Sequence, residues 1–336
     1  MSESDHHDAP LLRESLGPFV WTFVVVAAIA AFGGVLALLT TTSGRHPTTV
    51  PPPLDAQATA TLAPSQRAVP HLDPPAGQSA AAALVANFNL YGCTESAPSW
   101  PSCTQRFPAQ WSYLNRYRVS IVGVQELEPS VFALFQGQVR APGSVWAMYP
   151  SQPTYVHQQT TGILWRSDQW HLVTAEEFDV VKYSWRDGSG VHFMNAHDAA
   201  VLLRATNGRQ LWVISIHNMS GENTSFGSGL AQDEATEADE FARRTASGIP
   251  VVLVGDFNDD TVGAICAVQS RTPGAHSIWG PIPAGGCANA GATHGQPYDK
   301  IIGSSNVEFT ASGIDWSVQS QKVTDHGIAW ADALIR

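Results

Sequence analysis

Polar residues of the types used in catalysis lie where short apolar runs of this chain begin or end. At six such places the sequence has Asn89, Glu126, His217, Asp256, Asn258, Asp299, Asp325 and His326. One polar residue at a strand end is unremarkable, because strand ends are commonly solvated. Strand ends converge on one edge of a sheet, however, so six polar places in one chain indicate a shared functional site.

These residue types suit chemistry at a phosphate group. Glu126 and Asp325 are hard oxygen donors of the kind that Mg²⁺ prefers, and Asn89 offers a neutral partner. The imidazoles of His217 and His326 and a further carboxylate can act as general acid or base. Amide side chains can also donate hydrogen bonds to a phosphate oxygen.

The apolar runs predict strands, and helical stretches separate some of them. The clearest strand-like runs are residues 84–90, 119–126, 161–166, 211–217, 251–257 and 299–304. Helical stretches are expected at 111–117, 129–137 and 235–246, the last with acids early and arginines late, as the helix dipole prefers. Several runs are apolar nearly throughout, which is typical of strands in a sheet covered on both faces. The pattern predicts an α/β domain.

The overall composition is that of a folded and acidic protein. Of the 336 residues, 44% are hydrophobic and 14% are charged, which is ample apolar material for a core. The formal net charge of −11 argues against a protein that coats nucleic acid through a basic surface. It does not exclude an enzyme that handles phosphates through a metal. We expect residues 80–336 to form the folded domain.

An apolar segment near the N-terminus predicts a membrane anchor. Residues 16–42 contain no charged residue, and the 21 residues Phe19–Leu39 are nearly all apolar. As a helix they would span about 30 Å, the thickness of the hydrocarbon core of a bilayer. A cleaved signal peptide has a shorter apolar region and a basic start, whereas residues 1–15 form an acidic tail.

A proline-rich linker follows the expected anchor. Residues 43–79 carry eight prolines, a composition that favours an extended, semi-rigid stalk, although a disordered region without a spacing role would look the same. The orientation in the membrane stays open, because Arg13 before the anchor and Arg45 and Arg67 after it do not satisfy the positive-inside rule.

Four cysteines lie beyond the linker: Cys93, Cys103, Cys266 and Cys287. Their spacing contains no C-x-x-C and does not fit a structural zinc site. Four cysteines allow three pairings; the local pairs are the simplest, and two pairs of buried free thiols are the alternative. An even number of cysteines behind a membrane anchor favours an oxidising compartment, so we expect the domain outside the cytoplasm.

Seven segments between Asn87 and Gly327 carry a family resemblance. In order they read NFNLYG, VGVQELE, GILWR, WVISIHN, VGDFND, YDKIIG and TDHG. This order resembles the endonuclease/exonuclease/phosphatase superfamily, which includes pancreatic-type DNases, abasic-site nucleases, sphingomyelinases and inositol-phosphate phosphatases. The resemblance implies a four-layer α/β sandwich with two mixed β-sheets and a metal-dependent phosphoester cleft at one end.

The resemblance also implies a metal site and a general base. Glu126 would bind Mg²⁺, with Mn²⁺ as an alternative ion, and Asn89 and Asp325 would assist. His326, held and polarised by Asp299, would draw a proton from the attacking water.

The remaining site residues would handle the water, the phosphate and the leaving group. By the same resemblance Asp256 would orient the water or serve the leaving group. Asn258 would hydrogen-bond a nonbridging phosphate oxygen, and His217 would contact the phosphate or protonate the leaving oxygen.

The sequence departs from the family pattern in a few places. No acidic partner is evident for His217, and Gln158 or Gln159 are candidates for that place. Tyr91 stands where some abasic-site nucleases carry an Asp, which weakens an assignment to that branch. Arg166 ends a predicted strand, where it could reach a phosphate or be solvated.

The leading hypothesis is a metal-dependent phosphodiester hydrolase, an extracytoplasmic nuclease held at the membrane by its N-terminal helix. Residues 1–79 hold three of the 18 basic and six of the 29 acidic residues, so the domain carries 15 against 23. A DNA groove would need local cations, and six arginines could cluster to supply them: Arg116, Arg118, Arg140, Arg166, Arg186 and Arg204.

Two other readings stay open. The first is a phospholipid or sugar-phosphate phosphodiesterase or phosphatase. The second is a catalytically inactive binding module, which would be expected to lose a metal ligand or the base, whereas Glu126, Asp325 and His326 are all present. No protein partner is predicted.

Overall fold

The computed structural model describes residues 79–93, 99–152, 161–187, 190–218, 229–280, 282, 286–288 and 295–336, with the backbone alone within 181–195. The expected tail, the anchor and nearly all of the linker precede residue 79 and lie outside this part of the chain. Among the described residues, no helix is long and apolar enough to cross a membrane.

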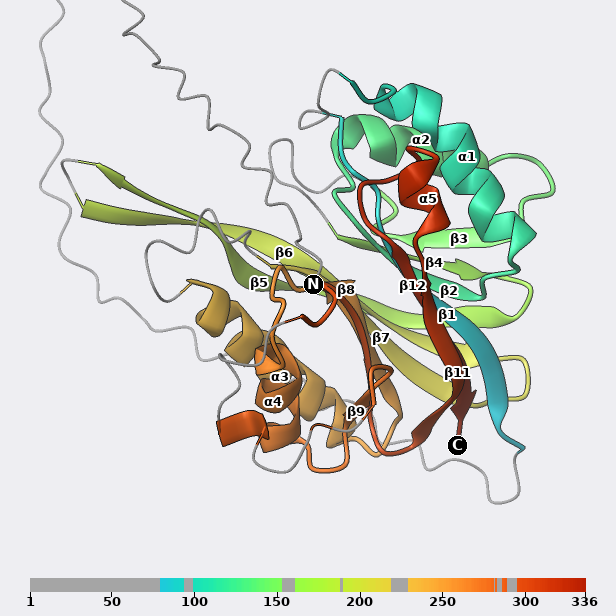
Figure 1. Ribbon diagram of the computed structural model, residues 1–336. Coiled ribbons are helices and arrows are strands. Elements are labelled where there is room, and N and C mark those ends of the chain that lie inside the picture. Colours follow the sequence, from blue (N-terminus) through green and yellow to red (C-terminus); the bar gives the residue numbers. More distant parts are fainter. Residues whose placement is uncertain are drawn as a thin grey trace, which may run out of the picture. The chain divides into compact units, whose positions relative to one another are not determined.

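The described strands form two six-stranded mixed sheets (Figure 1). The first sheet has the order β11-β12-β1-β2-β4-β3. Its strands are β1 (Ala81–Asn89), β2 (Ile121–Gln125), β3 (Trp146–Tyr149), β4 (Gly162–Arg166), β11 (Val307–Asp315) and β12 (Ile328–Ile335). Here β1 runs parallel to β2 and antiparallel to β12.

The second sheet repeats this arrangement at its centre. Its order is β5-β6-β7-β8-β10-β9, and its strands are β5 (Trp170–Asp187), β6 (Gly190–Ala205), β7 (Gln210–His217), β8 (Val251–Asp256), β9 (His276–Ser277) and β10 (Asp299–Gly303). β7 runs parallel to β8, which is antiparallel to β10. In Figure 1 the far end of the β5–β6 hairpin extends beyond the rest of its sheet.

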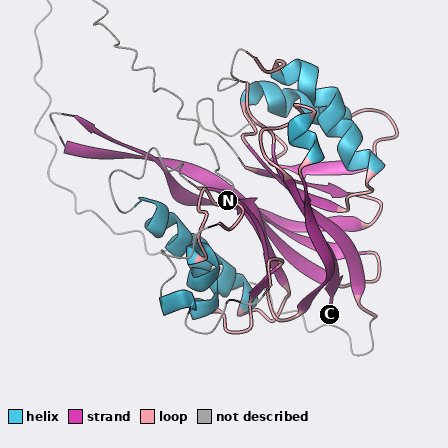
Figure 2. Cartoon of the chain, in the orientation of Figure 1, coloured by secondary structure: helices cyan, strands magenta, loops and turns pink. Residues whose placement is uncertain are grey.

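The sheets pack face to face, and helices cover their outer faces (Figure 2). The first sheet is covered by α1 (Cys103–Arg116), α2 (Pro129–Val139) and the short α5 (Ser317–Ser320). The second is covered by α3 (Gly229–Thr245) and α4 (Gly263–Arg271). A third apolar cluster fills the space between the sheets. The described domain is therefore the expected four-layer α/β sandwich.

The two sheets approach each other closely near the middle of β2. A Cβ atom on Gly123 would lie 2.2 Å from Cγ2 of Val254 on β8, so the contact requires glycine. Side chains of alternate residues on each strand fill the remaining space between the sheets, because the side-chain period of a strand is two.

The six strands predicted from apolar runs are all present, with shifted ends. The β5–β6 hairpin and strands β3, β9, β11 and β12 were not predicted. In β5, Glu176, Glu177 and Asp179 interrupt the apolar pattern, because β5 is the edge strand of its sheet.

Helices also extend further than their apolar patterns. The helix expected at 111–117 begins at Cys103, where Ser102 and Gln105 form a capping box. The helix expected at 235–246 begins at Gly229. Arg244 near its end is fully buried and pairs with Glu176 and Glu240, so tertiary ion pairs as well as the helix dipole account for it.

Candidate active site

Rows of inward-facing residues carry polar side chains to one edge of the sandwich. On β1 the row that includes Val85 continues as Asn87 and Asn89, and on β8 the row that includes Val254 continues as Asp256. The same edge holds Gln125, Glu126, Ser215, His217, Asp299, Asp325 and His326. Strands β1, β2, β7 and β8 end there, whereas β10 and β12 begin there.

Asp299 and His326 form a hydrogen-bonded pair between the two sheets. Oδ2 of Asp299 lies 2.8 Å from Nδ1 of His326. Oδ1 of Asp299 accepts a 2.6 Å hydrogen bond from Nδ2 of Asn87, whose own Oδ1 accepts one from Gln125. Both oxygens of the buried Asp299 carboxylate are therefore engaged, and the imidazole ring is held through Nδ1.

The other ring nitrogen of His326 faces Asp256. Nε2 lies 3.7 Å from Oδ2 of Asp256, and Nε2 of His217 lies 3.6 Å from the same oxygen. Burial lowers the pKa of His326, but the Asp256, Asp299 and Asp325 carboxylates outweigh it and raise the pKa to about 11. His217 thus has an acidic neighbour, Asp256, that sequence reasoning did not identify.

Asp256 is a buried carboxylate that several donors hold in the charged form. Burial alone would raise its pKa, but His326, His217, the Asn258 backbone N–H and the Asn89 side chain lower it. The Asn258 N–H donates to Oδ1 at 2.9 Å, and Asn89 donates to Oδ2 at 3.0 Å. The arrangement suits a group that stays negative beside two imidazoles.

Asn89 connects this centre to Glu126. Its Nδ2 donates to Oε1 of Glu126 at 3.0 Å as well as to Asp256, and its Oδ1 accepts from the Tyr91 backbone N–H at 2.9 Å. In this structure Asn89 therefore orients two carboxylates, and its expected assistance to the metal includes the positioning of Glu126.

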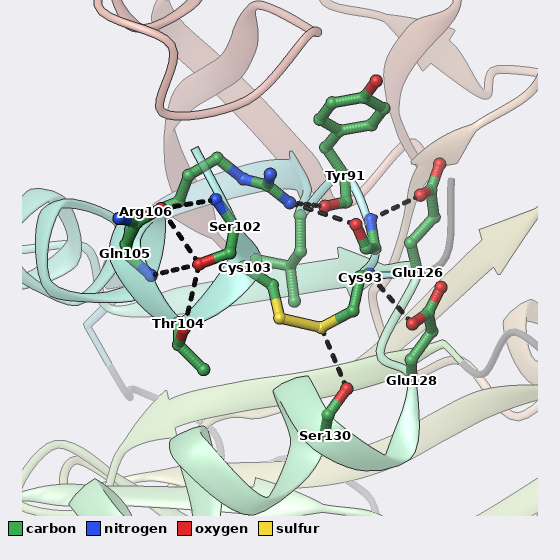
Figure 3. The surroundings of a disulfide bond; sticks show 12 residues. Tyr91, Cys93, Ser102, Cys103, Thr104, Gln105, Arg106, Glu126, Glu128 and Ser130 are labelled. Atoms are coloured by element: carbon green, nitrogen blue, oxygen red, sulfur yellow. Dashed lines mark hydrogen bonds between the residues drawn. A yellow bond between two sulfur atoms is a disulfide. The ribbon is translucent and has the colours of Figure 1, made fainter. Parts of the chain in front are cut away.

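The segment after β1 holds the second oxygen of Glu126 (Figure 3). The backbone N–H of Gly92 donates to Oε2 of Glu126 at 2.7 Å, and that of Cys93 donates to Glu128 at 2.9 Å. The buried Arg106 guanidinium donates to the carbonyl oxygens of Tyr91 and Gly92. Glu126 itself has φ +56°, so its side chain leaves the strand alternation toward this segment.

Both local cysteine pairs lie at bonding distance. The Sγ–Sγ distance is 1.97 Å for Cys93–Cys103 and 2.18 Å for Cys266–Cys287. The first pair ties the segment that contacts Glu126 to the start of α1 (Figure 3). Cys93 directly follows Gly92, so the disulfide is attached to the residue next to the backbone N–H that positions a candidate metal ligand.

The residues at Glu126 and Asp325 fit a divalent cation. Oδ1 of Asp325 is buried and has no hydrogen-bond partner among the described residues. Burial, with Glu126 and Asp256, raises the pKa of Asp325 to about 6, although His326 opposes this. A cation between these oxygens would satisfy the orphaned atom and relieve the repulsion. No group of three or more His, Cys, Asp or Glu in the described residues forms a ready-made metal cluster, so the ion would need further ligands from water or substrate.

Asn258 belongs to a loop after β8 that several hydrogen bonds hold in place. Its Nδ2 donates to the carbonyl oxygen of Asn218 at 2.9 Å, and its φ is +46°. The buried Lys300 ammonium donates to the carbonyl oxygens of Asp259 and Pro297 and so supports the same loop. Asn218 in turn donates to the fully buried Glu237 of α3 at 3.4 Å. The expected contact of Asn258 with a phosphate stays a prediction.

Sequence reasoning missed the residues behind the row of candidate catalytic side chains. Asn87, Gln125 and Ser215 form a buried polar layer that links the sheets through Gln125 Nε2, which lies 2.8 Å from Asn87 and 3.2 Å from Ser215. The signal was present, because Asn87 precedes Asn89 by two residues and so shares its face. Gln158 and Gln159, the candidate partners of His217, lie outside the described residues.

Four of the six arginines proposed for a nucleic-acid groove lie away from the candidate site. Arg116 and Arg118 precede β2, Arg166 ends β4 and forms an ion pair with Asp168, and Arg204 lies at the end of β6. All four positions are at the strand ends opposite the site, because β2 ends at the site and β4 is antiparallel to it. The possible phosphate contact of Arg166 at this site is therefore wrong.

Comparison with solved structures identifies the fold. A search with family models found no match, and neither did a search of curated proteins. Among solved structures, an endonuclease/exonuclease/phosphatase from Bacteroides vulgatus is similar with a TM-score of 0.57 and 13% identity, covering 76% of this chain and 100% of that one. The human Nocturnin catalytic domain with bound sulfate gives 0.57 and 15%, covering 76% and 95%.

A third similar structure contains nucleic acid. D. rerio TDP2 complexed with a single-strand DNA product gives a TM-score of 0.52 and 14% identity, covering 75% of this chain and 99% of that one. At these identities the likeness shows that this chain has the endonuclease/exonuclease/phosphatase fold, and the chemistry rests on the residues described above.

Proposed function

We propose that this protein is a metal-dependent phosphoester hydrolase. The observation that carries the proposal is the Asp299–His326 pair, whose free ring nitrogen points at Asp256 beside the Glu126 and Asp325 carboxylates. An imidazole oriented by one carboxylate and next to a cation site is the arrangement that water activation requires.

The residues divide the reaction among themselves. In its neutral form His326 takes a proton from water at Nε2, while Asp299 holds the ring through Nδ1 and stabilises the imidazolium that forms. The surrounding carboxylates raise the pKa of His326 to about 11, so a cation beside Asp325 would be needed to offset their charge and give the neutral ring. Asp256, 3.7 Å from Nε2, accepts the water's other hydrogen bond and so directs its oxygen toward phosphorus. Glu126 and Asp325 would hold a divalent ion, which would neutralise charge at the phosphate when bound.

The leaving side of the phosphate faces His217. Nε2 of His217 lies 3.6 Å from Oδ2 of Asp256. From this position it donates a proton to the leaving oxygen as the bond to phosphorus breaks. Asn258 has a second amide hydrogen beyond the one given to Asn218, and this hydrogen is available to a nonbridging oxygen.

The proposed substrate is a nucleic acid, cleaved outside the cytoplasm by a chain that its N-terminal segment holds at a membrane. A solved structure of this fold, TDP2, is a complex with a single-strand DNA product. The apolar run Phe19–Leu39 and the two cysteine pairs support the location. Sugar-phosphate hydrolysis is the second candidate, because another structure of this fold is a mannosyl-6-phosphatase from Bacteroides thetaiotaomicron.

The test uses the full-length chain in detergent with supercoiled plasmid and Mg²⁺. We expect nicking that EDTA abolishes and that His326→Ala abolishes without a large change in melting temperature. Nicking that persists in His326→Ala would refute the assignment of the base. If a folded protein does not nick the plasmid, then RNA, single-stranded DNA, phospholipid and sugar-phosphate substrates follow in turn, and no turnover of any of them would refute the proposed function.

A further inference from the structure

Two exposed aromatic side chains lie beside the Asp299–His326 pair. Tyr298 is 48% exposed and directly precedes Asp299, and Trp316 is 54% exposed. The Trp316 ring lies against Gly327, the residue after His326: a Cβ atom on Gly327 would be 2.7 Å from its Cε3. Tyr298 is therefore bonded to one member of the pair, and Trp316 packs on the residue that follows the other.

The two rings come from different sheets but from the same flank of the site. Tyr298 stands at the start of β10, and Trp316 follows the end of β11, at the edge where β12 begins. Strand β10 contacts β11 and β12 across the sandwich. The flank formed by β10 and β11 thus presents one aromatic residue from each sheet next to the phosphoester centre.

The backbone beneath both residues is fixed to the site. The carbonyl oxygen of Tyr298 accepts a 3.0 Å hydrogen bond from the N–H of Phe257, which follows Asp256. Gln319, on the turn that begins at Trp316, donates to the carbonyl oxygen of Asp325 at 2.7 Å. These contacts fix the backbone that carries both aromatic residues relative to the Asp256 and Asp325 segments.

Packing of the core does not explain these side chains. Neither Tyr298 nor Trp316 belongs to the three apolar clusters of the described residues. Exposed aromatic rings fixed beside a reaction centre offer flat surfaces for stacking, and a nucleobase is the flat group that a phosphodiester most commonly carries. Stacking of this kind requires a base that is not already stacked in a duplex.

The placement of charge agrees with recognition of bases. Duplex binding depends on cations that track both phosphate backbones. Arg116, Arg118, Arg166 and Arg204 lie at the opposite strand ends, while the described residues at the site edge include Glu126, Asp256, Asp299 and Asp325. Affinity near the scissile phosphate must therefore come from contacts other than these arginines.

We infer that Tyr298 and Trp316 form a stacking subsite for an unpaired base next to the scissile phosphate. The substrate class is single-stranded nucleic acid or a nucleotide ester, in preference to relaxed duplex DNA, sugar phosphates or phospholipids. Nicking of supercoiled plasmid is then expected at segments that negative supercoiling unpairs. This inference rests on the proposed function, because it places the subsite beside the same reaction centre.

The test compares three ligands with the full-length chain in detergent: an oligothymidylate, its duplex with oligoadenylate, and an abasic tetrahydrofuran backbone of the same length. Binding and kcat and KM for cleavage are measured for the unaltered chain, Trp316→Ala, Trp316→Phe and Tyr298→Ala. Tyr117→Ala is the matched control, because Tyr117 is also 48% exposed and lies at the opposite edge, before β2.

We expect the single strand to bind more tightly than the duplex or the abasic backbone. Trp316→Ala and Tyr298→Ala should each raise Kd and KM for the single strand roughly 5- to 100-fold, with little change for the abasic backbone. Trp316→Phe, which keeps a ring, should recover most of the affinity, and Tyr117→Ala should have no effect.

Other outcomes separate the two proposals. Equal losses on single-stranded and abasic ligands, or no loss in either alanine variant, would overturn the stacking subsite while leaving hydrolysis intact. Trp316-dependent binding of the single strand without cleavage of any ligand would uphold the subsite and overturn the proposed function. Preference for the duplex would overturn the substrate class.

Discussion

Asp299 and His326 are joined by a hydrogen bond that crosses from one sheet to the other. Asp299 begins β10 of the second sheet, His326 precedes β12 of the first, and their side chains meet at 2.8 Å. Asn87 of the first sheet makes the second contact to the same carboxylate, at 2.6 Å. The orientation of the proposed base is thus set by the interface between the sheets.

Asp299→Asn should lower kcat by about 10²–10⁴-fold, because an amide cannot stabilise the imidazolium that forms on His326. KM and the melting temperature should change little, since the amide is nearly the same size. Steady-state kinetics and thermal unfolding provide the measurement. Glu308→Gln, an exposed carboxylate paired with Arg336, is the control. An unchanged kcat in Asp299→Asn would show that the pair does not act in catalysis.

Asn87→Ala should reduce both stability and rate. It removes one partner from the buried Asp299 and one from Gln125, so the free energy of unfolding should fall by about 1–3 kcal/mol. The rate should fall by roughly tenfold through looser orientation of Asp299. Denaturant unfolding and kcat are the readouts, with the exposed Asn306→Ala as control. A loss of stability with full activity would make Asn87 purely structural.

Mg²⁺ should stabilise the folded chain, and EDTA should reverse this. At 100 times the dissociation constant the gain is about 2.7 kcal/mol. Asp325→Asn should lose the stabilisation by Mg²⁺. Without metal it should be no less stable than the unaltered chain, because the substitution removes the repulsion between the Asp325 and Glu126 carboxylates. Melting temperatures with and without Mg²⁺ test this, and the exposed Asp332→Asn should keep the gain. A full Mg²⁺ gain in Asp325→Asn would place the ion elsewhere.

The two cysteine pairs should differ in their effect on the site. Replacing Cys93 and Cys103 by serine should cost about 3 kcal/mol of stability and should also raise the Mg²⁺ concentration needed for activity, because Gly92 holds Glu126. Replacing Cys266 and Cys287 should affect stability alone. Unfolding and Mg²⁺ titration of activity distinguish the pairs, after mass spectrometry of unreduced peptides has established the bonds. The same Mg²⁺ requirement in both double variants would separate the first pair from the site.

Stability should fall between about pH 4.5 and pH 8 through Glu234. Burial and the neighbouring Asp259 raise the pKa of Glu234 from 4.5 to about 8. The folded state then keeps a proton that the unfolded state releases in this window, so rising pH favours unfolding until pH passes the folded value. At about pH 8 the free energy of unfolding of Glu234→Gln should exceed that of the unaltered chain by roughly 1–3 kcal/mol, because the amide does not titrate.

The Glu234→Gln measurement is a series of unfolding curves from acid to mildly basic pH. The gain in stability over the unaltered chain should grow with pH and level off above about pH 8. Asp332→Asn, at an exposed position of β12, serves as the reference for loss of one carboxylate. A gain that does not vary with pH would show that Glu234 is not protonated in the folded protein.

The candidate site residues could be predicted because they interrupt or end apolar strands. His326, Asp256 and Glu126 stand out against runs of buried residues, and the strand ends bring them together as expected. The Asp299–His326 pairing followed from the family resemblance alone, since nothing in the spacing of 27 residues indicates it.

Other features depend on tertiary contacts that a sequence does not display. The Arg166 side chain is of a type that binds phosphate, but the antiparallel pairing of β4 with β2 places it at the strand ends opposite the candidate site. The β5–β6 hairpin has charged residues on an edge strand and so lacks a clean alternation. Nothing in the sequence around Trp316 indicates that it lies beside the site; its contact with Gly327 in the folded chain shows this.

The close approach of the sheets at Gly123 links the distance between the sheets to the rate of the proposed reaction. Hydrogen bonds from Asn87 to Asp299, from Asn89 to Asp256 and from Gln125 to Ser215 all span the same gap. A side chain at position 123 would widen that gap at Val254 without touching any reacting group. The turnover rate of this protein would then depend on the distance between the two sheets.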